Sequence, residues 1–172
     1  MISASRVAAR PFVVALSFVA LFVLSPRPAL AKDMANRLGI GYEDQFSVDM
    51  PGIAAKFYPS HDVGVSGVVG IDTQQGASRF GLLGKIHKII FHEDNLHFYM
   101  GAGAGTLSSQ SAGTTNSGFV LMAFCGAEFF FAGLENLGFS FETGVGVDSV
   151  SNAVRFRTFG DSPLRAGITF YF

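Results

Sequence analysis

The chain has 172 residues, with 12 basic and 13 acidic side chains, and only 15% of its residues are charged. This balance excludes the strongly basic surface that a nucleic-acid-binding protein presents. The single cysteine, Cys125, excludes an internal disulfide. It falls on the apolar side of a predicted strand, where cysteine usually behaves as a small hydrophobic residue.

Residues 1–31 have the three parts of a secretory signal peptide. Arg6 and Arg10 form a positive start, Phe12–Leu24 is an uncharged apolar run, and Ala29-Leu30-Ala31 is a small-x-small cleavage pattern. The apolar run is shorter than the roughly 20 residues that a membrane-spanning helix needs. We therefore expect cleavage after Ala31, export, and one mature domain over residues 32–172, which is mildly acidic because the signal removes only basic charge.

The mature chain is built from runs in which apolar residues alternate with other residues, the pattern of a β-strand with one apolar face. Turn-forming residues separate the runs, and no segment keeps a helical period. The eight predicted strands are Arg37–Ser47, Ile53–Pro59, Val63–Asp72, Arg79–Phe91, Leu96–Leu107, Gly118–Phe131, Leu137–Asp148 and Pro163–Phe172.

Three of the connections are expected to be polar loops: Thr73–Ser78, Ser108–Ser117 and residues 149–162. The alternation of the fourth run blurs at Lys88–Ile90, where we expect a β-bulge. Val154–Phe159, inside the last connection, also alternates. It is either an extension of the eighth strand or part of an extra hairpin that would give ten strands, and we favour eight.

The two phases of the alternation differ in charge. The apolar phase carries almost no charged side chain, and a lipid-facing surface requires this because a Lys or Arg at the bilayer midplane costs about 2–4 kcal/mol. An eight-stranded barrel is just wide enough for side chains to fill its interior. We therefore predict an all-β, closed, up-and-down antiparallel transmembrane barrel. Its lumen would hold a polar network of Glu43, Lys56, Lys85, His87, His97, Glu128, Glu142 and Arg165.

The alternative is a soluble, secreted lipocalin-like barrel with the apolar phase inward around a ligand, because alternation alone fits either polarity. Aromatic residues near the ends of the runs, the terminal Phe170-Tyr171-Phe172 and the low charge content favour the membrane barrel.

The last run carries a family resemblance. Leu164, Ala166, Ile168, Phe170 and Phe172 share one phase and end on an aromatic residue. This ending resembles the C-terminal strand of bacterial outer-membrane barrels. The whole of residues 32–172 resembles the small eight-stranded proteins of the OmpA/OmpX type, without the periplasmic domain of the larger members.

That resemblance implies the outer membrane of a Gram-negative bacterium as the location. It implies outer-membrane lipid, lipopolysaccharide and the barrel assembly machinery as partners, with Ile168, Phe170 and Phe172 as the assembly signal. We expect a monomer that binds no nucleic acid.

The sequence offers little chemistry. His87 and His97 flank one turn and, with Glu128, can form a His/His/Glu cluster of the kind that binds metals, but polar filling of the lumen explains them better. Some barrels of this size are lipid A-modifying enzymes with a Ser-His-Glu arrangement, yet no His lies on the outward phase beside a Ser. We predict no enzymatic activity, no cofactor and no metal, and a structural, envelope or surface-interaction role. The alternative is a lipid A-modifying enzyme or a narrow channel.

Overall fold

The computed structural model describes residues 32–44, 50–74, 77–111, 113–150, 153–158 and 164–172. The predicted signal peptide lies outside these residues, as does the end of the first predicted strand at residues 45–47. In the described part no helix is long and apolar enough to cross a membrane. The strands are β1 (Leu38–Glu43), β2 (Gly52–Phe57), β3 (Val63–Gln74), β4 (Ala77–Glu93), β5 (Leu96–Ser111), β6 (Thr114–Phe130), β7 (Leu137–Val150), β8 (Ala153–Thr158) and β9 (Arg165–Tyr171).

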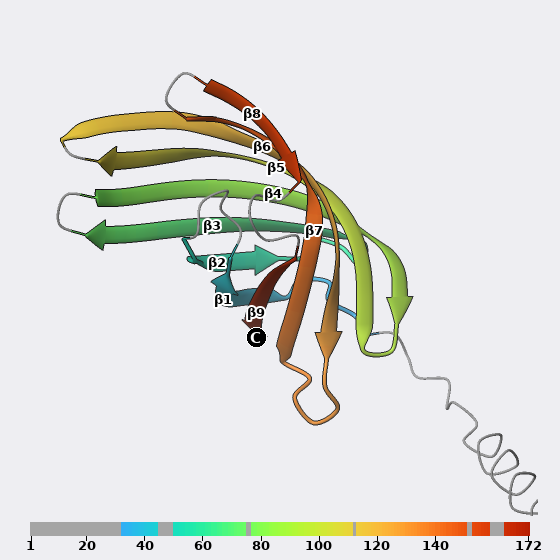
Figure 1. Ribbon diagram of the computed structural model, residues 1–172. Coiled ribbons are helices and arrows are strands. Elements are labelled where there is room, and N and C mark those ends of the chain that lie inside the picture. Colours follow the sequence, from blue (N-terminus) through green and yellow to red (C-terminus); the bar gives the residue numbers. More distant parts are fainter. Residues whose placement is uncertain (1–31, 45–49, 75–76, 112, 151–152, 159–163) are drawn as a thin grey trace, which may run out of the picture. The chain divides into compact units, whose positions relative to one another are not determined.

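The sheet closes on itself. Each strand from β1 to β7 pairs antiparallel with the next, β7 pairs with β9, and β9 pairs with β1 through the register Gly39↔Tyr171 to Glu43↔Gly167. Eight strands therefore form the barrel wall, which confirms the predicted up-and-down architecture (Figure 1). Closure matters physically because it leaves no open sheet edge within the ring of eight strands, although β8 pairs with β7 alone and keeps one edge open.

Strand β8, the segment that could have given a barrel of ten strands, is an extension of the eighth strand of the wall. Strand β8 pairs with Val145–Val150 of β7, and β9 pairs with Leu137–Glu142 of the same strand. The two short strands therefore follow one another along β7 instead of forming a separate hairpin.

The wall is much taller on one side than on the other. Strands β4, β5 and β6 have 17, 16 and 17 residues, whereas β1, β2 and β9 have six, six and seven. The long hairpins reach far past the short strands, away from the end that holds the C-terminus (Figure 1). The expected loops Thr73–Ser78, Ser108–Ser117 and 149–162 were therefore largely wrong, because most of their described residues pair as strand. Gly113, just before β6, has a φ of 81°, in the left-handed region that favours glycine.

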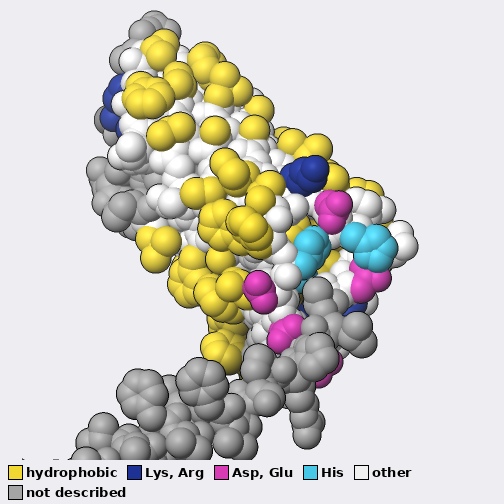
Figure 2. Space-filling model, turned by 90° about the vertical axis from the view of Figure 1, so that its right-hand side faces the viewer, with side chains coloured by type: hydrophobic (Ala, Val, Ile, Leu, Met, Phe, Trp, Pro, Cys, Tyr) yellow, Lys and Arg dark blue, Asp and Glu magenta, His cyan; other side chains and the backbone are white. Residues whose placement is uncertain are grey.

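The predicted bulge is confirmed. The register between β4 and β5 shifts between Ile89 and Phe91, so Ile90 and Phe91 are both exposed on the outer surface. Most of the other outward positions are also apolar and exposed, with Ile53 at 68% and Ile71 at 66%, whereas Lys88, Thr106 and Thr143 are polar exceptions on the same phase. Hydrophobic side chains cover much of the face seen in Figure 2. An apolar surface of this extent is unusual in a soluble monomer.

Candidate functional site

The charged phase of the alternation points into the barrel. The interior residues lie on seven strands and are at most 5% exposed: Glu43 on β1, Lys56 on β2, Lys85 and His87 on β4, His97 on β5, Glu128 on β6, Glu142 on β7 and Arg165 on β9. This polarity is opposite to that of a soluble barrel, in which the apolar phase faces inward.

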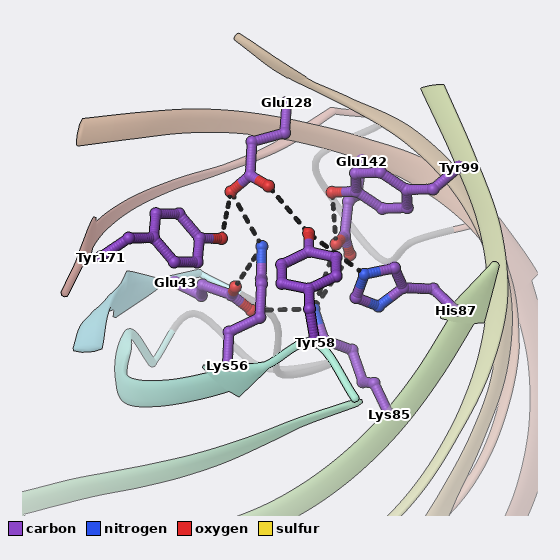
Figure 3. A network of polar contacts seen from close by, with 9 residues as sticks. All are labelled: Glu43, Lys56, Tyr58, Lys85, His87, Tyr99, Glu128, Glu142 and Tyr171. Carbon is purple, nitrogen blue, oxygen red and sulfur yellow. Dashed lines mark hydrogen bonds and ion pairs between the residues drawn. The ribbon is translucent and has the colours of Figure 1, made fainter. Parts of the chain in front are cut away.

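Five of these residues form one chain of alternating charge across the lumen (Figure 3). Lys56 Nζ lies 3.1 Å from Glu128 Oε1 and 3.6 Å from Glu43 Oε1. The other oxygen of Glu43 lies 2.8 Å from Lys85 Nζ, which in turn lies 3.1 Å from Glu142 Oε1. Because β2 and β6 lie four strands apart in the ring of eight, the contact between Lys56 and Glu128 joins opposite walls. Each buried lysine has two carboxylate partners, so its desolvation is offset by close pairing.

Three tyrosines complete the ends of this chain. Tyr58 and Tyr171 donate to the two oxygens of Glu128, at 2.9 and 2.7 Å. Tyr99 donates to Glu142 Oε1 at 2.9 Å. These phenols add donors to the carboxylates at the two ends of the chain, and hydrogen bonds to charged groups are the stronger kind. Their position on the inward phase was visible in the sequence, but their partners were not.

The two interior histidines occupy different places. His87 is level with Gly101 in the sheet, its Nε2 lies 3.4 Å from the Tyr58 hydroxyl, and its ring packs 4.8 Å from that of Tyr99. His97 is level with Glu128 and packs against His92 and Phe130 instead. Among the described residues, no three His, Cys, Asp or Glu side chains already surround a metal-sized point.

A second polar group lies nearer the long hairpins and was missed. Asp148, 1% exposed, accepts from Arg157 Nε at 2.8 Å and from Arg155 Nη2 at 3.3 Å. It continues the inward phase of β7, so the alternation carried the signal. The prediction ended the seventh strand at this residue and treated the arginines as loop. Arg165 lies across from Glu142 in the register of β7 and β9.

Apolar layers enclose the ionic chain on both sides. Toward the long hairpins, Val68, Leu83, Leu107, Val120 and Met122 are buried on the same inward phase. Toward the end with the C-terminus, the buried residues are Met34, Ile89 and Phe130. The charged layer is therefore shielded from bulk solvent and held in place, an arrangement suited to holding the walls together.

The comparisons with known proteins identify the fold. Among solved structures, the chain matches the N-terminal β-barrel domain of OprF from Pseudomonas aeruginosa, with a TM-score of 0.51. The match covers 80% of this chain and 98% of that domain at 14% identity. The chain has the fold of an outer-membrane protein's barrel domain. No family model and no curated protein matches the sequence. For the fold, the resemblance to small eight-stranded outer-membrane barrels is thus confirmed.

Proposed function

We propose that this protein is an integral barrel of the outer membrane of a Gram-negative bacterium, with a structural, envelope or surface-interaction role. The proposal rests on the apolar outer surface combined with a closed wall. Such a surface is stable only against lipid, and a closed barrel leaves no unpaired strand edge there. The likeness to the OprF barrel domain supports the same location.

The export and assembly route belongs to the same proposal. Residues 1–31 would act as a cleaved signal peptide, and Ile168, Phe170 and Phe172 as the signal read by the barrel assembly machinery. All three lie on the outward, exposed phase of the closing strand or directly after it. Lipid and lipopolysaccharide would be the surrounding partners of a monomeric barrel.

The observation that carries the structural role is the sealed interior. The ionic chain fills the lumen, and buried apolar side chains lie on both sides of it. A water-filled path through a barrel needs polar, hydrated walls, which this stack does not offer. We therefore infer that the protein does not conduct ions.

An enzymatic role is less well supported. A serine nucleophile needs a base within hydrogen-bond reach. His61, His87 and His92 instead contact Asp33, Tyr58 and Asp62, respectively. We propose a non-enzymatic barrel on this ground.

Two measurements test the proposal against its alternatives. In planar lipid bilayers the purified mature protein should give no conductance steps above those of protein-free membranes. Mass analysis of lipid A from a deletion strain should match that of the parent strain. Regular conductance steps would establish a channel instead, and a lipid A species lost on deletion and restored by complementation would establish an enzyme.

A further inference from the structure

The apolar band on the outside of the barrel is far shorter along β1 and β2 than along β4 and β6. Among the described residues, the exposed apolar positions span residues 38–42 on β1 and 53–57 on β2. They span residues 80–91 on β4, and 119–131 on β6 and the residue after it. Lys88 interrupts the band of β4 near one end, from which a long lysine side chain can reach the membrane surface.

Strand geometry converts these spans into heights. A residue advances about 3.3 Å along a strand, and barrel strands tilt by about 35–45° from the barrel axis. The apolar band is therefore about 25–30 Å high at β4 and β6, which matches the hydrocarbon core of a bilayer. At β1 and β2 it is only about 10 Å high. The long strands fit a bilayer of ordinary thickness, and the short strands do not.

A charged residue marks the point where the short side ends. Asp44 follows β1, continues its outward phase and is partly exposed, and its amide donates to the Ala166 carbonyl of β9 at 3.1 Å. The Asp44 carboxylate also acts electrostatically on Arg165, at the start of β9. Toward the long hairpins, Asp44 lies about 15 Å beyond Leu38, which is the midplane of a flat core about 30 Å thick. A partly exposed carboxylate is unfavourable there, so the lipid beside β1 must differ from a flat bilayer.

We propose that the outer membrane is locally thinned along β1 and β2, so that lipid headgroups contact the wall at the level of Tyr42 and Asp44. The inference rests on the membrane location proposed above. A bilayer accommodates an apolar band shorter than its core by thinning beside it. Tilting the whole barrel does not remove the mismatch, because β1 and β2 lie opposite β5 and β6 in the ring and tilting leaves the difference in height between the two sides. The short side is thus a surface for lipid headgroups, and the tall side is a surface for acyl chains.

Depth-dependent fluorescence quenching tests this proposal, because the chain contains no tryptophan. Three single variants replace exposed outward side chains: Tyr42→Trp at the end of the apolar band on β1, Phe80→Trp at the corresponding end on β4, and Ile86→Trp midway along β4. Each mature protein is folded into phosphatidylcholine vesicles whose acyl chains carry bromine either close to the headgroup or close to the chain end. Heat-dependent gel mobility confirms that each variant is folded.

Tyr42→Trp should be quenched more strongly by the shallow bromine than by the deep one, as Phe80→Trp should be. Its apparent depth should lie at least about 10 Å nearer the lipid surface than that of Ile86→Trp, the matched control for the middle of the core. An apparent depth within about 5 Å of that of Ile86→Trp would show a core of even thickness and overturn the proposal.

The control also separates this inference from the membrane location. Strong deep quenching of Ile86→Trp establishes that the barrel is embedded in lipid, whatever the result at position 42. Weak quenching at all three positions would overturn the membrane location, and the local thinning with it.

Discussion

Glu142 shows what a single buried charge contributes to this barrel. Its two oxygens accept from Lys85 Nζ at 3.1 and 3.2 Å, and one of them also accepts from Tyr99 at 2.9 Å. Removing Glu142 leaves Lys85 with Glu43 as its one remaining carboxylate and leaves the Tyr99 hydroxyl without this acceptor. Breaking such a buried pair costs up to about 3–5 kcal/mol.

We therefore expect Glu142→Leu to lower the free energy of unfolding by that amount, measured by urea titration of the protein folded into lipid vesicles. Glu135→Leu, in an exposed turn, should change it by less than about 0.5 kcal/mol. Equal stability of the two variants would show that the ionic chain does not hold the walls together.

Gly126 illustrates why the inward phase is rich in glycine. A Cβ at this position would lie 2.6 Å from the Phe141 carbonyl oxygen and 2.8 Å from Glu142 Cγ. At Gly67, on the outward phase, a Cβ would meet no atom within 4 Å. A side chain at position 126 would therefore clash with the wall and with Glu142 inside the barrel. At position 67 the protein itself leaves room for a side chain.

Gly126→Ala should accordingly destabilise the barrel by about 1–3 kcal/mol through overpacking. Gly67→Ala should be neutral, or stabilising by up to about 1 kcal/mol, because it reduces the backbone entropy of the unfolded chain. The same urea titration compares them, and a larger loss at position 67 than at 126 would contradict the assignment of faces.

At this scale the sequence predicts the face of a residue but not its partner. The alternation placed Glu43, Lys56 and Glu128 on one phase, and the structure finds all three inside. Their pairing depends on strand stagger and on which walls oppose each other across the lumen. Lys56 and Glu128, 72 positions apart, meet only after closure.

Among the elements, β8 is held differently from the strands of the wall. It pairs with β7 alone, and Asp148 anchors it through Arg155 and Arg157. Closure of the barrel depends on β9 instead, so β8 can loosen while the wall stays intact.

Asp148→Asn should therefore leave urea stability nearly unchanged but increase the rate of trypsin cleavage after Arg155 or Arg157 about tenfold. That factor corresponds to about 1.4 kcal/mol, near the lower end for hydrogen bonds to charged groups. Asp94→Asn, at the opposite end of the barrel, serves as the control. An unchanged cleavage rate would mean that Asp148 does not anchor β8.

Phe172 follows β9, the strand that closes the barrel. Phe172 is exposed and its amide donates to the Leu38 carbonyl at 3.0 Å, so its backbone closes the barrel while its side chain stays available to a partner. Phe172→Ala keeps that backbone bond. We expect it to refold from urea like the unchanged protein but to reach the outer membrane of cells at a reduced level. A reduced yield in both settings would assign Phe172 a structural role only.

Strand ends were the part of the fold that the sequence predicted least well. Ser108–Ser111 and Thr114–Ser117 carry small polar side chains, which are typical of loops, yet they pair across a two-residue connection that contains Gly113. Small polar side chains suit a strand whose two faces both meet polar surroundings, so polarity there does not distinguish loop from hairpin. Where one face is apolar, as in β2 and β9, the alternation located the strands well.

On the scale of the whole molecule, the barrel combines an apolar exterior, a closed wall of unequal height and a sealed interior. The exterior and the interior follow from the alternation: one phase supplies the outer surface, and the other supplies charged groups that must pair in the narrow lumen. The unequal height of the wall does not follow from it. The function then depends on the outer surface meeting lipid.

Heat-dependent gel mobility tests that central claim most directly. Outer-membrane fractions from cells that make the protein are dissolved in SDS and analysed with and without boiling. A closed lipid-embedded barrel should resist unfolding without heat, so the unheated protein should migrate as a distinct band that shifts to the unfolded position on boiling. A single band that ignores heating, or recovery of the protein in the soluble fraction, would contradict the account.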